Sequence, residues 1–66
     1  MGAKKILDER EAAEMLGVSH RTLQGWRRRK VGPPFVKVAS HVIRYRQTDV
    51  AAFIERKLVA TELVEA

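Results

Sequence analysis

The fold is decided by residues 8–26, which read DEREAAEMLGVSHRTLQGW. Asp8 stands where a helix N-cap is expected, and Glu11, three residues later, completes the pattern of a capping box. A helix is therefore predicted over Glu9–Leu16. Gly17 follows directly, and glycine most readily adopts the left-handed conformation that ends a helix.

A second helix is predicted after a very short connection. Ser19 can cap it, and its apolar residues Leu23 and Trp26 are three positions apart and therefore lie on one face. We expect this helix to run over about residues 20–30. Only two residues and the cap separate it from the first helix, and this spacing is typical of a tight helix-turn-helix corner.

The sizes of the side chains around this corner support a steep helix crossing. A small residue at Ala13 allows the two helix backbones to approach closely, and Val18 fills the space beneath the turn. The first helix is expected to bury Ala12, Ala13 and Leu16, and the apolar face of the second helix closes the core.

A β-hairpin is predicted after the second helix. Residues 32–34 read Gly-Pro-Pro and end that helix, because proline lacks the backbone donor and restricts the residue before it. Two short runs with β propensity follow, at 35–38 and 42–46, and residues 39–41 join them.

Alternation along these two runs predicts which side chains share a face. In the first run Val36 and Val38 face one way and Lys37 the other. In the second run Ile43 and Tyr45 alternate with two arginines. The sequence therefore predicts an amphipathic hairpin, the wing, whose outer face carries Lys37, Arg44 and Arg46.

A third helix is predicted to begin near Gln47. Asp49 lies in its first turn, where a negative charge interacts favourably with the helix dipole. Apolar residues at positions i, i+3, i+4 and i+8 are expected to cover the hairpin and the first helix. These residues are Val50, Phe53, Ile54 and Leu58.

Length and composition predict one small domain that is mainly α with a small β-hairpin, a winged helix-turn-helix. A chain of 66 residues buries only about 60% of the surface that it exposes when unfolded, so its core is thin. We expect residues 1–66 to form a single domain with a core at about 6–58 and flexible ends at 1–5 and 59–66.

Several classes of protein are disfavoured by what the sequence lacks. It has no cysteine, and His20 and His41 lie far apart without further ligands, so we expect no metal site and no cofactor. No nucleophile–base pair or paired carboxylates with a supporting pocket can be identified, so we expect no catalytic residues and no enzyme activity. Neither a membrane-spanning run nor the apolar core of a signal peptide is present, so a cytoplasmic protein is expected.

The charge distribution is more informative than the net charge. Residues 17–46 contain eight basic side chains and no acidic one, whereas the rest of the sequence contains five basic and eight acidic side chains. The two parts carry +8 and −3, which gives the net charge of +5. Segregation on this scale predicts a surface that binds a polyanion. A merely solubilising face is the alternative interpretation.

Motifs along three quarters of the chain resemble one family. In order they are LDEREAAEMLGVS at 7–19, RTL at 21–23, WRR at 26–28, GPPF at 32–35, RYR at 44–46, DV at 49–50 and FI at 53–54. This series resembles the excisionase and AlpA-like helix-turn-helix family, relatives of the MerR-type winged helix.

The resemblance implies a winged-helix fold and double-stranded DNA as partner. Many relatives are excisionases of phages and mobile elements, which bind adjacent sites, bend DNA and help a tyrosine integrase to excise a prophage in the bacterial host cell. Others regulate transcription. Many relatives carry proline at the position of His20, and a glycine-rich wing tip where this chain has residues 39–41, so their DNA specificity does not carry over.

The second helix is expected to present its polar face to the major groove. Arginine can form two hydrogen bonds with guanine, and glutamine can do the same with adenine. Gly25 permits close approach to DNA, although simple tolerance at an exposed site explains it equally well. Ser19 could contact phosphate, but capping the helix is a sufficient role. The predicted DNA-binding residues of this helix and its cap are Ser19, His20, Arg21, Gln24, Gly25 and Arg28.

The wing is expected to contact the adjacent minor groove, whose negative potential attracts basic side chains. Arg44 is the strongest candidate here, although it could instead stack on an aromatic neighbour, and Arg46 could pair with Asp49. Arg27, Arg29 and Lys30 are expected to meet phosphates or solvent, and Trp26 is assigned to the core. The predicted DNA-binding residues of the wing are Lys37, Ser40, His41, Arg44 and Arg46.

The favoured function is that of an excisionase-type architectural protein, with a tyrosine integrase and neighbouring copies of itself as partners. A small AlpA-like or MerR-like transcriptional regulator is the alternative. The chain's length favours the excisionase, because MerR-like regulators usually append a dimerising helix and an effector domain. A protein-interaction module without a DNA role remains a further alternative. An RNA binder is less favoured, since no exposed aromatic platform is recognisable.

Overall fold

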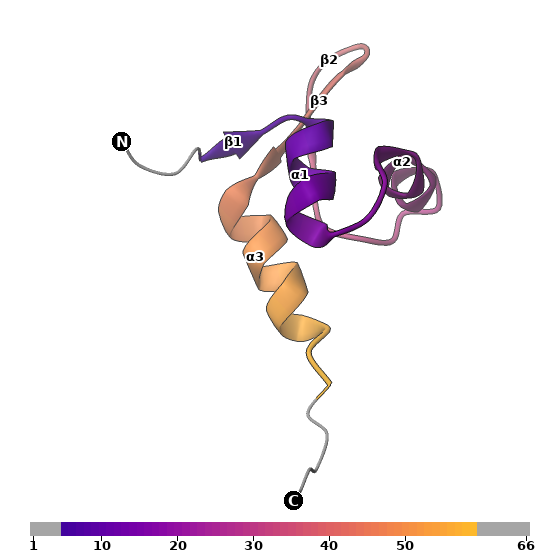
Figure 1. The fold of residues 1–66 in the computed structure, drawn as a ribbon. Helices are drawn as coiled ribbons and strands as arrows, with labels where there is room; N and C mark the ends of the chain where they lie inside the picture. The colour runs from indigo at the N-terminus through magenta and orange to yellow at the C-terminus, as the bar shows by residue number, and fades with distance from the viewer. Residues whose placement is uncertain (1–4, 60–66) are drawn as a thin grey trace, which may run out of the picture.

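The computed structural model describes residues 5–59. A three-stranded antiparallel sheet is combined with three helices, and the hairpin projects beyond the helices (Figure 1). The predicted flexible ends lie, apart from Lys5 and Val59, outside the described residues. The elements in chain order are β1 (Ile6–Leu7), α1 (Glu9–Leu16), α2 (His20–Arg28), β2 (Val36–Ala39), β3 (Val42–Arg46) and α3 (Gln47–Arg56).

Helix α1 has the predicted bounds and both predicted ends. The Asp8 side chain accepts a hydrogen bond from the Glu11 backbone N–H at 2.8 Å, and Glu11 Oε1 accepts one from the Asp8 backbone N–H at 2.8 Å. This is the complete capping box. Gly17 adopts the left-handed conformation with φ of 75°, as predicted, and its N–H donates to backbone carbonyls of the last helical turn.

Helix α2 begins as predicted but ends two residues early. The Ser19 side chain accepts a hydrogen bond from the Thr22 N–H at 3.1 Å and so caps the helix. The helix ends at Arg28 rather than at residue 30. Lys30 adopts a positive φ of 61°, which is incompatible with helical continuation, and the Val31 N–H donates back to the Trp26 carbonyl at 2.9 Å. The chain therefore turns away before the prolines are reached.

The sheet contains a strand that the sequence did not predict. Strand β1 is only two residues long and pairs antiparallel with β3, with Ile6 opposite Arg46 and Leu7 opposite Tyr45. The order of the strands is β1-β3-β2, so β3 is central. A two-residue strand is too short to show an alternating pattern, which is why sequence periodicity could not reveal it.

The register of the hairpin contradicts the predicted basic face. Val36 lies opposite Arg44, and Lys37 lies opposite Ile43, with an irregularity before the next pair. Residues directly opposite one another share a face of a sheet, so Lys37 lies on the face of Ile43 rather than with Arg44. A shift of one residue in register exchanges the two faces, and composition alone does not fix the register. The three basic residues of the wing therefore do not lie together.

The core sits where α1, α2, β3 and α3 meet. Its buried members are Leu7, Ala12, Ala13, Leu23, Tyr45 and Val50, and partly buried Leu16, Val18, Trp26 and Ile43 pack against them. The apolar stripe of α3 covers the core only in its first half, because Val50 is fully buried whereas Ile54 and Leu58 are 39% and 74% exposed. Leu58 also lies beyond the end of the helix. The predicted coverage by Ile54 and Leu58 is therefore wrong.

Trp26 and Phe53 join α2 to α3 at the edge of this core. Their ring centroids are 5.9 Å apart and the rings are tilted by 49°. The backbone at Gly32 passes close to the indole ring of Trp26. A Cβ added at this position would lie 3.0 Å from Trp26 Cε3. Its φ of 87° is also one that side-chain-bearing residues rarely adopt.

Gly32→Ala is expected to destabilise the protein by about 1–3 kcal/mol, because it adds both backbone strain and a clash with Trp26. Urea denaturation followed by the fluorescence of Trp26 measures this. Gly25→Ala is the matched control, since Gly25 is helical and a Cβ there would approach nothing closer than Arg28 Nη2 at 4.0 Å. A Gly32→Ala protein as stable as the parent chain would contradict the assigned close packing.

Candidate nucleic-acid interface

The face of α2 that points away from the core carries the predicted recognition residues. Arg21 and Arg28 are exposed, and His20, Gln24 and Gly25 are partly buried. Leu23 occupies the opposite face and is 1% exposed, which fixes the orientation of the helix. The Ser19 hydroxyl caps the helix and donates to the Thr22 hydroxyl at 3.0 Å, so its local hydrogen bonds account for its presence.

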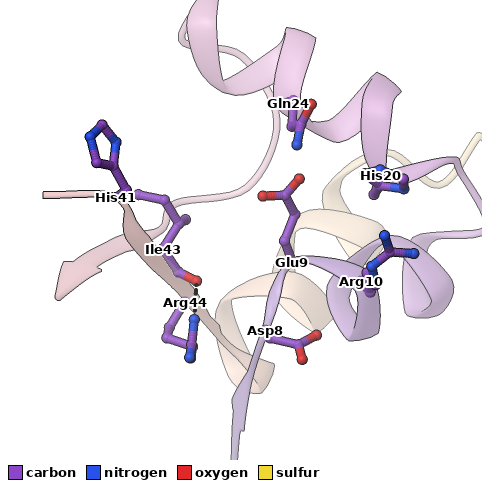
Figure 2. A pocket seen from close by; sticks show the side chains of 8 residues that line it. All are labelled: Asp8, Glu9, Arg10, His20, Gln24, His41, Ile43 and Arg44. Atoms are coloured by element: carbon purple, nitrogen blue, oxygen red, sulfur yellow. Dashed lines mark hydrogen bonds between the residues drawn. The ribbon is translucent and has the colours of Figure 1, made fainter. Parts of the chain in front are cut away.

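A hollow between α2 and the hairpin brings together four of the predicted residues. His20 and Gln24 reach it from α2, and His41 and Arg44 from the hairpin (Figure 2). We call it the helix–hairpin hollow; its other lining residues are Asp8, Glu9, Arg10 and Ile43. The predicted residues that do not line it are Ser19, Arg21, Gly25, Arg28, Lys37, Ser40 and Arg46.

A second hollow also borders the hairpin. Lys37, which the register of the hairpin places on the other face from Arg44, lies in this second hollow. Lys37 and Ser40 line it together with His41, and Arg27 and Lys30 contribute further basic groups from the end of α2 and the turn after it. His41 therefore stands at the tip between the two hollows. Basic side chains therefore lie on both faces of the wing, whereas the sequence predicted a single basic face.

Arg27 has a different role from the one predicted. Its Nη1 lies 3.3 Å from Tyr45 Oη, to which it donates a hydrogen bond, and 3.6 Å from Glu9 Oε1. The guanidinium carbon also lies 5.7 Å from the centre of the Phe35 ring, and its side chain is only 21% exposed. Arg27 is therefore not a free phosphate ligand: it ties α2 to α1 and to β3.

Glu9 is a site residue that the sequence analysis missed. Its side chain is 21% exposed, and within the described residues its Oε2 is enclosed without a hydrogen-bond partner. The carboxylate points towards Gln24 in the helix–hairpin hollow (Figure 2). The available signal was its place as the first residue of α1, but one residue at a helix end does not reveal which neighbour it faces. Two acidic residues, Asp8 and Glu9, therefore line the hollow beside basic ones, and Arg27 holds the Glu9 carboxylate.

The two arginines of β3 both have partners within the protein. Arg44 Nη1 donates to the Ile43 carbonyl at 2.9 Å, which holds the side chain against the strand. Arg46 forms two hydrogen bonds with the Asp49 carboxylate, at 2.6 and 3.0 Å, which confirms the alternative that it pairs with this residue. The hydrogen bonding to Asp49 raises the pKa of Arg46, and the negative charge of Asp49 raises it further by a smaller amount. Arg46 lies at the junction with α3, at the opposite end of β3 from the wing tip.

Residues 5–59 contain no group of three or more histidine, cysteine or acidic side chains arranged to hold a metal ion. Within the same range, no helix has both the length and the apolar character needed to cross a membrane.

Comparison with known families decides the class of this interface. Residues 6–58 match the family model described as a helix-turn-helix domain. The chain belongs to this family. No curated protein matches the chain significantly. The family, the three helices and the hairpin together make this helix-turn-helix protein a winged DNA-binding domain with DNA as its partner.

We expect the substitutions Arg27→Ala and Arg28→Ala to have different effects. The first should mainly lower the stability of the protein, and the second should mainly weaken its electrostatic attraction to DNA. Arg27→Ala should lower the free energy of unfolding by about 1–3 kcal/mol, because Glu9 and Tyr45 lose their shared partner. Arg28 is exposed, so Arg28→Ala should leave stability nearly unchanged and, if it contacts phosphate, reduce the salt slope of DNA binding by about 1.

The measurements are thermal unfolding and salt titration of DNA binding for both variants. The two substitutions remove the same charge from neighbouring positions, and each variant therefore controls for the other. If Arg27→Ala reduced the salt slope while leaving the melting temperature unchanged, its assigned structural role would be wrong.

Proposed function

We propose that this helix-turn-helix protein is a non-enzymatic, excisionase-type architectural protein, which binds adjacent sites on double-stranded DNA and bends the duplex. The observation that carries the proposal is the helix–hairpin hollow. Side chains of α2 and of the wing tip approach the same space from two sides. A duplex held this way would take α2 in its major groove and the wing in the adjacent minor groove.

The short length of the recognition helix α2 supports binding of several copies of the protein to neighbouring DNA sites. Helix α2 has nine residues and is therefore about 14 Å long, which spans roughly four base pairs. A single such contact provides little specificity in a genome. Copies bound side by side would add their contacts, and the bends imposed by successive wings would accumulate.

The resemblance of residues 7–54 to excisionases supports the finer assignment, in which the bent array assists a tyrosine integrase in excising a prophage. The protein would then act on DNA in the cytoplasm of the bacterial host. A small AlpA-like or MerR-like transcriptional regulator would more naturally use a two-fold dimer on an inverted repeat. The arrangement of sites on natural DNA therefore distinguishes the two functions.

DNA binding is expected to weaken strongly with salt. If about six phosphates are neutralised, the slope of log K against log salt concentration should be near −5, because each neutralised phosphate releases about 0.9 counterion. Fluorescence anisotropy of a labelled duplex across a salt series measures this slope. A slope shallower than about −2 would contradict the assignment of residues 17–46 as a polyanion-binding surface.

Footprinting on a natural site is expected to show cooperative, head-to-tail occupation of direct repeats about one helical turn apart. The free protein should be largely monomeric in analytical ultracentrifugation, since in this arrangement DNA aligns the copies. Addition of the protein to the cognate integrase should stimulate excision in vitro. An isolated inverted-repeat footprint without stimulation of excision would support the regulator instead.

A further inference from the structure

One oxygen of the Glu9 carboxylate is enclosed in the protein without a hydrogen-bond partner among residues 5–59. The other oxygen, Oε1, lies 3.6 Å from Arg27 Nη1, whereas no donor within the described residues reaches Oε2. An enclosed carboxylate oxygen of this kind costs free energy, because it has lost water without gaining a hydrogen bond. Such atoms are uncommon in native proteins, and a role in function is one of the reasons for which they persist.

The Gln24 side chain faces this carboxylate across the helix–hairpin hollow. Figure 2 shows the amide nitrogen of Gln24 directed towards the Glu9 carboxylate, with the amide oxygen turned away from it. Hydrogen-bonding chemistry favours this orientation, because an ionised carboxylate only accepts and the NH2 group is the only donor of a glutamine side chain. The opposite orientation would place acceptor oxygens against each other.

The Glu9 carboxylate is itself held from the core. Arg27 Nη1, which pairs with Glu9 Oε1, also donates a hydrogen bond to Tyr45 Oη at 3.3 Å, and Tyr45 is 1% exposed. The Glu9 backbone begins α1 directly after the capping residue. Glu9 is therefore restrained both by its backbone and by Arg27, so its second oxygen faces the hollow in a fixed direction.

We propose that Glu9 is a positioning residue that sets the base preference of Gln24. When α2 lies in the major groove, the Glu9 carboxylate accepts a hydrogen bond from one N–H of the Gln24 amide. This hydrogen bond fixes which end of the amide faces α1. The inference rests on the proposed placement of α2 in the major groove, and it assigns to Glu9 the orientation of one reading side chain.

The orientation matters because the two ends of the amide recognise different atoms. Glutamine reads adenine through two hydrogen bonds, in which its oxygen accepts from N6 and an N–H donates to N7. The amide has two N–H bonds, so Glu9 can hold one while the other remains for the base. A free amide can turn over, whereas a held amide offers its oxygen and its remaining N–H in one order along the groove. Adenine in one strand is then favoured where Gln24 meets the DNA.

Glu9 acts through Gln24 rather than on a base. A carboxylate can accept a hydrogen bond from N4 of cytosine, but this contact needs a carboxylate that is open to the groove. The Glu9 side chain is only 21% exposed, and Arg27 holds one of its oxygens. Glu9 also belongs to α1, whereas Gln24 belongs to the recognition helix α2.

Selection from a pool of duplexes with a randomised site tests the inference in the full-length protein. The position at which Gln24→Ala loses the preference of the parent protein is the position that Gln24 reads. Competition among four duplexes, one for each base at this position, then measures the preference. We expect Glu9→Gln to reduce the preference for adenine by about fivefold or more, since one bidentate contact contributes roughly 5–150-fold. The new amide both donates and accepts, so it no longer selects one orientation of Gln24.

Asp8→Asn is the matched control for the lost charge. Asp8 lines the same hollow, and asparagine caps a helix about as well as aspartate does. The Asp8 carboxylate accepts from the Glu11 N–H, and Figure 2 shows it directed away from Gln24. Both substitutions should raise the affinity for all duplexes alike, because each removes a charge that repels phosphate. Only Glu9→Gln should change the preference for one base.

The double variant Glu9→Gln with Gln24→Ala shows how the effect is transmitted. Without the Gln24 amide, Glu9→Gln should no longer alter any base preference. A preference that still changed would mean that Glu9 contacts the base directly, and this would overturn the positioning role. An unchanged preference in Glu9→Gln alone, or in Gln24→Ala, would overturn it as well. Preferences at single sites are measured without bending or cooperative binding, so a failure of the excisionase assignment is observed separately.

Discussion

The arrangement of helices and wing depends on the burial of Tyr45 at the centre of the sheet. Its side chain is 1% exposed, its backbone pairs with Leu7 of β1, and its hydroxyl accepts a hydrogen bond from Arg27 of α2. The ring also stacks at a tilt on Phe35, which precedes β2, with centroids 6.1 Å apart. In a chain with so thin a core, one large side chain that touches several elements determines how the wing is oriented relative to the helices.

Local signals in the sequence predicted the helices well. The capping box around Asp8 and Glu11, the left-handed Gly17 and the Ser19 cap each involve residues within about one turn, so their geometry depends little on the rest of the chain. Apart from the early end of α2, which is local, the predictions that failed were decided by contacts distant in sequence. The register that places Lys37 with Ile43, the two-residue β1 and the enclosure of Arg27 by Glu9 and Tyr45 all depend on which segments meet in space.

The charge pattern predicted a basic surface but not how individual charges are used. Arg27, Arg44 and Arg46 belong to the basic stretch, yet each has a hydrogen-bonding partner inside the protein. Arg27 holds the structure together, and an arginine that is anchored in this way presents its charge in a fixed position. Counting basic residues therefore overstates the number that are free to follow a phosphate backbone, while their clustering still identifies the surface.

The passage from wing to third helix contains no connecting residue, since β3 ends at Arg46 and α3 begins at Gln47. The paired Arg46 and Asp49 side chains brace this junction, and the Gln47 N–H donates to the Lys5 carbonyl at 2.8 Å. Because no loop lies between them, the direction of β3 sets the direction in which α3 starts. The wing and the third helix therefore cannot be repositioned independently without a change in the backbone torsions at Arg46 or Gln47.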